Sequence, residues 1–288
     1  MRFITIAATV AAVTVVATAS PTTTAPSTID VLNYALTLEH LEAAFYNIAF
    51  TKFSTADFTA AGVDSTVLDR LEHIREHENV HVSTLTSVIE SLNGNPVPPC
   101  TYDFPLNNVT QFLAIAQALE NTGVSAYTGA IAGLQGDYLT AAATIATVEA
   151  RHASYLNELW DQLGFPYAFD TPLSPPQVVT IATSFIKECP YKIPITPNTH
   201  LTATIPASGS KKVTTTFVGK GSNSTENTFC QFLYGERIAV SPRAQCRLPD
   251  DAIGYVYVFV TADKSPVNKP NSTILAGPTL LFNGTHIH

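Results

Sequence analysis

Charged side chains are scarce in this 288-residue sequence. They make up 13% of the chain, against 45% hydrophobic residues, and the 23 acidic residues outnumber the 15 Lys and Arg residues, for a formal net charge of −8. The sequence has no basic patch and no arginine-rich stripe, so we expect no nucleic-acid partner. A chain of this length and apolar content is large enough to form two domains.

Long apolar runs are also absent after the N-terminus. Arg2 precedes an almost wholly apolar stretch over residues 4–16, and Ala17-Thr18-Ala19 offers a cleavage site between small residues. The alternative is an N-terminal membrane anchor, but the stretch is shorter than the roughly 20 residues that a bilayer requires. We therefore predict a signal peptide over residues 1–19 and a secreted, extracellular protein, able to associate with the cell wall and free of the membrane after cleavage.

The four cysteines lack the C-x-x-C spacing of a zinc site or a redox pair. An even number of cysteines in an oxidising compartment favours disulfides. Four cysteines allow three pairings, and we favour Cys100–Cys189 with Cys230–Cys246 because each predicted domain then holds one bridge. Four N-x-S/T sequons agree with secretion and with a glycoprotein, at Asn108, Asn223, Asn271 and Asn283.

After a polar Pro/Thr linker at residues 20–28, residues 29–190 have helical periodicity. Four amphipathic helices are predicted over about 30–49, 65–92 (with Ser65 as its N-cap), 109–134 and 138–163 (closed by Gly164), and a short fifth helix over 175–187. The connection at residues 93–108 is long enough to run the length of such helices. The pattern predicts a four-helix bundle made of two hairpins joined by one crossover.

From residue 200 to residue 288 the periodicity changes from helical to two-fold. Runs rich in Val, Thr, Phe and Tyr occur at residues 212–218, 228–233, 254–261 and 272–281, separated by turn residues. We predict a small antiparallel β-sandwich of the immunoglobulin-like kind. No catalytic constellation is present in this part of the sequence.

The motif Glu-x-x-His occurs twice, as Glu78 with His81 and as Glu149 with His152. Residues at i and i+3 share one face of a helix. Both pairs fall in phase with the apolar stripe of their helix and so interrupt its core face. Burying a carboxylate without a partner is costly, and a metal cation is a suitable partner.

The helix that precedes each motif supplies a Glu and, two turns later, a Tyr. These pairs are Glu39 with Tyr46 and Glu120 with Tyr127, so the chemistry repeats with internal two-fold symmetry. Four carboxylates and two imidazoles match a dinuclear carboxylate site inside a helix bundle, and they suit iron or manganese. We expect two Fe or Mn ions held by Glu39, Glu78, His81, Glu120, Glu149 and His152.

Several neighbouring residues leave alternatives open. Glu42 competes with Glu39 as a ligand, although only Glu39 repeats the Glu-to-Tyr spacing. Tyr46 and Tyr127 either pack in the core or donate hydrogen bonds to ligand carboxylates. Gly123 lies inside a helix, where Gly costs about 1 kcal/mol relative to Ala, and could allow a close approach beside the site. Three further histidines are expected to face solvent, namely His40, His73 and His77, and Arg151 either faces outward or pairs with a carboxylate.

Four segments carry a resemblance to a known family: Leu38–Tyr46, His77–His81, Leu119–Tyr127 and Val148–His152. Residues 29–190 resemble the ferritin-like domain of secreted fungal proteins, some of which are described as stress-response proteins. The resemblance implies a ferritin-like bundle whose matching Glu and His positions bind metal. It extends to the β-domain of the same proteins but implies no function for it.

Two functions of different classes fit this sequence. The first is a redox metalloenzyme, an oxidase, ferroxidase or peroxide-handling protein, with Glu78 and Glu149 shared between the ions and the other ligands terminal. The second is a non-catalytic extracellular or cell-wall protein in which the bundle is a scaffold and the β-domain contacts a glycan or protein. Iron storage in a cage ranks last because the β-domain would obstruct a closed shell. We expect a monomer or small oligomer.

Overall fold

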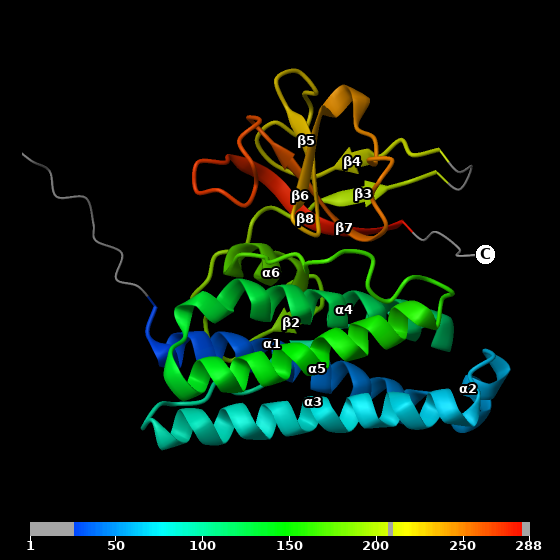
Figure 1. Ribbon diagram of the computed structural model, residues 1–288, viewed down its shortest axis with the longest axis vertical. Coiled ribbons are helices and arrows are strands. Elements are labelled where there is room, and N and C mark those ends of the chain that lie inside the picture. The colour runs from blue at the N-terminus through cyan, green and yellow to red at the C-terminus, as the bar shows by residue number, and fades with distance from the viewer. Residues whose placement is uncertain (1–25, 207–209, 284–288) are drawn as a thin grey trace, which may run out of the picture.

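The computed structural model describes residues 26–206 and 210–283. Figure 1 shows two parts, a helical region formed by the N-terminal half and a sheet region formed by the C-terminal part, with α6 (Pro175–Ala182) lying between them. This order agrees with the predicted helical and antiparallel sheet regions. The predicted signal peptide at residues 1–19 and most of the linker lie outside the described residues.

Four long helices make up most of the helical region. They are α1 (Thr28–Lys52), α3 (Ser65–Ser91), α4 (Val109–Ala130) and α5 (Gly136–Glu158), and the short α2 (Thr55–Ala60) precedes α3. The helices pack in two pairs, α1 with α3 and α4 with α5, and the pairs meet mainly through α1 and α4. Among the described residues, no helix combines the length and the apolar character needed to cross a bilayer.

The helix starts differ slightly from the prediction because side chains cap them. Ser27, expected in the linker, caps α1 by accepting a hydrogen bond from the Asp30 backbone, and the Asp30 carboxylate closes the capping box. Asp64, not Ser65, is the N-cap of α3, accepting from the Val67 backbone N–H at 2.8 Å. These caps fix the residues at which α1 and α3 begin, and therefore which of their side chains lie at the same level along the bundle.

Three helices end earlier than predicted, and the first is α4, which ends at Ala130 instead of residue 134 and continues as a short 3-10 turn over Ile131–Gly133. α5 was expected to reach Leu163 and Gly164, but it ends at Glu158, and Asp161 follows with a φ of 52° that a right-handed helix cannot accommodate. α6 was expected to reach Lys187, but it ends at Ala182. The next residues instead form β2 (Ile186–Glu188), which pairs with β1 (Thr101–Tyr102).

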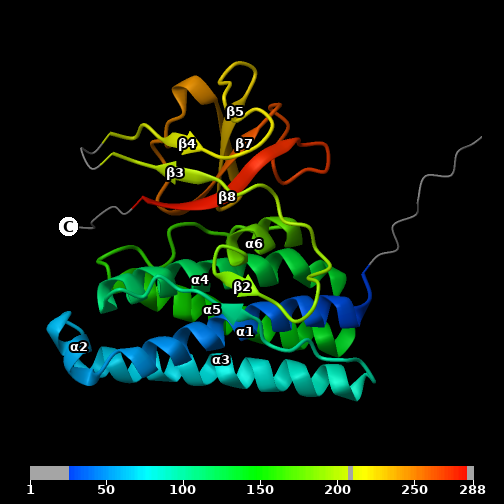
Figure 2. The same cartoon turned by 180° about the vertical axis from the view of Figure 1, so that it is seen from behind.

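The predicted crossover runs from the end of α3 to the start of α4, along the helices beside β2 (Figure 2). Asn33 on α1 holds it through two hydrogen bonds, to the Asn95 carbonyl at 3.1 Å and from the Val97 N–H at 2.9 Å. His40 lies 3.0 Å from the Val97 carbonyl, so it is half-buried under the crossover and not solvated as expected. The predicted Cys100–Cys189 disulfide is confirmed and closes this layer.

The C-terminal part contains an antiparallel sheet with the strand order β6-β5-β7-β8. The strands are β5 (Phe229–Tyr234), β6 (Arg237–Pro242), β7 (Gly254–Thr261) and β8 (Ile274–Asn283); β3 (Thr202–Thr204) and β4 (Thr214–Thr216) form a separate ribbon. The prediction missed β3 and β6. The β5–β6 hairpin turns at Gly235, whose φ of 52° suits a tight turn. The Cys230–Cys246 disulfide is confirmed, and the immunoglobulin-like sandwich stays a prediction.

One buried hydrophobic cluster spans both parts. Leu233, Tyr257 and Phe259 of the sheet belong to the same buried cluster as the aromatic residues of α1 and α4. The Tyr257 hydroxyl lies 2.7 Å from Ser125 Oγ and donates to the Asn121 carbonyl at 3.1 Å. The sheet therefore covers the outer face of α4, whose inner face carries the polar cluster described next.

Candidate metal centre

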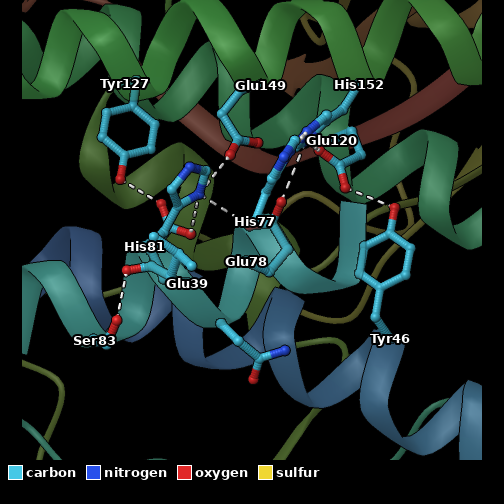
Figure 3. Close-up of polar contacts among 12 residues, drawn as sticks. Glu39, Tyr46, His77, Glu78, His81, Ser83, Glu120, Tyr127, Glu149 and His152 are labelled. Atoms are coloured by element: carbon cyan, nitrogen blue, oxygen red, sulfur yellow. Dashed lines mark hydrogen bonds and ion pairs between the residues drawn. The ribbon is translucent and has the colours of Figure 1, made fainter. Parts of the chain in front are cut away.

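Six of the predicted residues converge at the middle of the four long helices (Figure 3). The four glutamates are completely buried, and His81 and His152 are 8% and 6% exposed. α1 supplies Glu39 and α4 supplies Glu120, while the two Glu-x-x-His motifs come from α3 and α5: Glu78 with His81, and Glu149 with His152.

The first half of the cluster is centred on His81. Its Nδ1 lies 3.2 Å from Glu39 Oε2, 3.3 Å from Glu78 Oε2 and 3.3 Å from Glu149 Oε1. One ring nitrogen carries at most one hydrogen and cannot satisfy three carboxylates from three helices. A cation at this point would be attracted by all of them.

The second half is centred on His152. Its Nδ1 lies 3.1 Å from Glu120 Oε2 and 3.2 Å from Glu78 Oε1. Glu78 thus directs one oxygen to each histidine, and Glu149 also belongs to both halves. In each half the ligand atoms lie within 4.8 Å of one another, which brings them within reach of a single ion.

Three buried oxygens in the cluster have no hydrogen-bond partner: Glu78 Oε1, Glu149 Oε1 and Glu149 Oε2. Two of them lie about as close to a histidine nitrogen as a hydrogen bond would require, but not at an angle that forms one. In the described residues, no Lys or Arg pairs with any of these carboxylates. An unsatisfied buried oxygen costs about 1–3 kcal/mol, so the donor set fits a metal ion better than a metal-free core.

The two tyrosines contact the cluster as hydrogen-bond donors. Tyr46 donates to Glu120 Oε1 at 2.6 Å, and Tyr127 donates to Glu39 Oε1. Each donor fixes the carboxylate oxygen that does not face a histidine. The open choice between packing and hydrogen bonding is therefore resolved in favour of the hydrogen bond for both residues.

Glu42 is buried beside the cluster without belonging to either half. It faces Gly123 on α4, where an added Cβ would lie 3.0 Å from Glu42 Oε1 and 2.8 Å from Glu149 Oε2. By the internal repeat Glu42 and Gly123 are equivalent positions, each three residues after the Glu of its helix. The missing side chain at Gly123 leaves the space that the Glu42 and Glu149 carboxylates approach.

Burial governs the protonation of the carboxyl groups. It raises the pKa of Glu39 to about 7, and it raises the pKa of Glu149 well above its usual range together with the charges of Glu78 and Glu120. Burial and the charge of Glu149 do the same for Glu42. For Glu78 burial is outweighed by the close approach of His152 and His81, which lowers its pKa.

The pKa values of the two buried histidines are raised by the neighbouring carboxylates, against the effect of burial. Burial alone would lower the pKa of His81, but its contacts with Glu149, Glu39 and Glu78 raise it far above the usual value. For His152, Glu120 and Glu78 likewise outweigh burial and raise the pKa to about 10. Protons on His81 and His152 therefore offset part of the negative charge of the glutamates when no metal ion is bound.

His77 corrects one prediction. Its side chain is exposed, as expected, but its Nδ1 lies 2.9 Å from Nε2 of the buried His152. Residues 77–81 also have the His-Glu-x-x-His spacing of zinc peptidases, in which both histidines bind one ion. Here His77 lies behind His152 and does not join His81, so the spacing does not form that site. No pattern in the sequence indicated this contact, because it depends on how α3 and α5 cross.

The other helix residues lie as predicted. His73 is exposed and pairs with Asp69 and Glu76 on the surface of α3, and Arg151 is exposed on α5. Neither contributes to the cluster.

The sequence is similar to a protein family and to one curated protein. Residues 27–162 match the family described as a ferritin-like domain. Protein rds1 of Schizosaccharomyces pombe is 29% identical over 162 residues, which cover 55% of this chain and 39% of that protein. The match therefore spans well under half the length of that relative.

Among solved structures, a conserved hypothetical protein from Mycobacterium tuberculosis is similar in part. It has 18% sequence identity and a TM-score of 0.40, and the alignment covers 49% of this chain and 96% of that one.

Proposed function

We propose that this chain, whose residues 27–162 belong to the ferritin-like domain family, holds two iron or manganese ions in a four-helix bundle and uses them for redox chemistry. The ligands would be Glu39, Glu78, His81, Glu120, Glu149 and His152. The observation that supports this most is Glu78, whose two oxygens face two different histidines at 3.3 and 3.2 Å. A carboxylate in that position suits two adjacent cations.

Oxygen and imidazole donors without a thiolate suit iron or manganese. Such a pair of ions supplies a reversible change of oxidation state for reaction with dioxygen or peroxide, which is the basis for assigning an oxidase, ferroxidase or peroxide-handling activity. Glu78 and Glu149 would be shared between the ions. The other four residues would each serve one ion.

The protein's own contribution is positioning and exclusion of water. Tyr46 and Tyr127 hold the Glu120 and Glu39 carboxylates from behind, leaving their other oxygens toward the cluster. Buried apolar residues flank the site along α5, since Ile145 lies one turn before Glu149 and Leu156 one turn after His152. A dry, preorganised set of anions favours a bound cation.

The disulfides and the sheet region fit an extracellular protein with two domains, over about residues 29–190 and 200–288. Two disulfides are consistent with an oxidising compartment. The ribbon β3–β4 shares a buried core with the sheet through Leu201 and Val213, which favours a small sandwich. Because the sheet region covers α4 and α6, this face is blocked for packing into a ferritin-type shell.

Metal analysis of the purified chain tests the proposal. We expect about two Fe or Mn ions per chain, and loss of both in the double variant Glu78→Gln with Glu149→Gln. The matched control is Glu72→Gln with Glu158→Gln, which removes two exposed carboxylates from the same two helices. Consumption of peroxide or oxidation of Fe(II) by the loaded protein, absent in the double variant, would establish the redox role. A reconstituted wild type without metal would overturn the proposal and favour a scaffold.

A further inference from the structure

The histidine pair His77 and His152 connects the buried cluster to the protein surface. His77 Nδ1 lies 2.9 Å from His152 Nε2, and the two rings meet edge to edge, with their centroids 5.2 Å apart and their planes 15° apart. His152 therefore directs one nitrogen to the carboxylates of Glu78 and Glu120 and the other to His77 (Figure 3).

This geometry has a chemical consequence for metal binding. An imidazole that binds a metal through Nδ1 carries its hydrogen on Nε2, and that N–H needs an acceptor. Nδ1 of His77 is such an acceptor when His77 carries its own hydrogen on Nε2. The hydrogen bond then fixes both the ring orientation and the tautomer of His152.

The other half of the cluster has no equivalent. Among the described residues, no group forms a hydrogen bond with His81 Nε2. His77 is the residue directly before Glu78 in the first motif, and the residue directly before Glu149 in the second is Val148, which has no acceptor in its side chain. The internal repeat therefore fails at this position: His77 contacts His152, whereas Val148 cannot make the equivalent contact with His81.

We propose that His77 is a positioning residue that holds His152 in its metal-binding orientation and tautomer, so that the ion at His152 is held more tightly than the ion at His81. This inference rests on the proposed function, because it requires that both positions bind metal. It adds a residue outside the six predicted ligands and makes the two metal positions unequal.

Titration of the metal-free full chain with Mn(II) tests this, with free Mn(II) followed by electron paramagnetic resonance. The wild type should bind two ions in two phases. His77→Ala should weaken the tighter phase about 10- to 100-fold, the usual effect of removing the hydrogen-bond partner of a metal-binding histidine. His77→Asn places an amide oxygen near the position of Nδ1 and should restore most of that affinity. His73→Ala, one turn earlier on the same exposed helix face, should bind like the wild type.

The outcomes separate the two proposals. If the wild type binds no Mn(II), the proposed function is wrong and the role of His77 fails with it. If the wild type binds two ions and His77→Ala binds both equally well, only the role of His77 is wrong. Equal weakening of both phases with a lower melting temperature of the metal-free protein, without recovery in His77→Asn, would also overturn it, because that is the pattern of a structural defect.

Discussion

Tyr46 on α1 donates a hydrogen bond to Glu120 on α4, and Tyr127 on α4 donates one to Glu39 on α1. In the sequence each tyrosine follows the glutamate of its own helix by seven residues, yet in the structure each serves the glutamate of the other helix. The two contacts cross the α1–α4 interface in opposite directions. They tie the two helical hairpins together at the level of the candidate metal centre.

Removing one of these hydroxyls should destabilise the fold. In Tyr46→Phe the Glu120 oxygen loses its donor while staying completely buried, and hydrogen bonds to charged groups contribute about 1.5–3 kcal/mol. We expect the free energy of unfolding of the metal-free protein to fall by about 2 kcal/mol, measured by urea denaturation.

The matched control is Tyr155→Phe. The Tyr155 hydroxyl is buried with no hydrogen-bond partner among the described residues, so its removal should be neutral or stabilising. Equal losses in Tyr46→Phe and Tyr155→Phe would show that packing, not the hydrogen bond to Glu120, carries the effect.

Metal binding should strengthen as pH rises. Coordination needs an unprotonated Nδ1 and ionised carboxyl groups, whereas the raised pKa values of His152, about 10, and Glu39, about 7, keep protons on these groups at neutral pH. Each bound ion must release them, so the association constant should rise through neutral pH and be lost in acid. Titrations with Mn(II) at several pH values, with proton release recorded in weak buffer, measure this; an affinity that does not change with pH would contradict it.

Gly123→Ala should separate metal affinity from helix stability. Ala favours the helix by about 1 kcal/mol over Gly. Its Cβ, however, would lie 2.8 Å from Glu149 Oε2, so the shared carboxylate must move. We expect an affinity for Mn(II) reduced about 10-fold or more, with little loss of thermal stability in the metal-free protein.

Gly129→Ala, six residues later on α4, provides the contrast. There an added Cβ would lie 1.9 Å from the Leu173 carbonyl oxygen, which is backbone and cannot rotate away. This variant should unfold at a lower temperature than Gly123→Ala. If Gly123→Ala binds metal normally, the space beside Glu149 has no role in the site.

The two disulfides should contribute unequally to stability. Cys100–Cys189 spans 89 residues of sequence and Cys230–Cys246 spans 16. In the chain-entropy account the longer loop is worth roughly 4.5 kcal/mol and the shorter roughly 3 kcal/mol. Replacing each pair with Ala and measuring unfolding in guanidinium should give that order, and the reverse order would show that native packing around the bridges dominates.

The sequence predicted the polar cluster well because its signal is local. Glu78 with His81, and Glu149 with His152, each lie on one helix at a spacing that fixes a common face, and both interrupt an apolar stripe. Repetition of the pattern then allowed Glu39 and Glu120 to be paired with them.

The sequence could not predict contacts that depend on how helices cross. His77 and His40 occupy polar positions on their helices. Only the placement of α5 brings His77 against His152, and only the path of the crossover brings His40 against the Val97 carbonyl. Helix ends were missed for a different reason. Gly164 was the stronger sequence signal for the end of α5, but the chain leaves the helical conformation earlier, at Asp161. After Ala182 the pairing of β2 with β1 replaces the helix that the sequence pattern predicted.

The contact between Tyr257 and α4 places one constraint on two parts of the protein. Asn121 and Ser125 contact the sheet on one side of α4, while Glu120, Gly123 and Tyr127 lie beside the candidate metal site on the other. A shift of the sheet relative to α4 would therefore also displace these cluster residues, because both contacts lie on one helix.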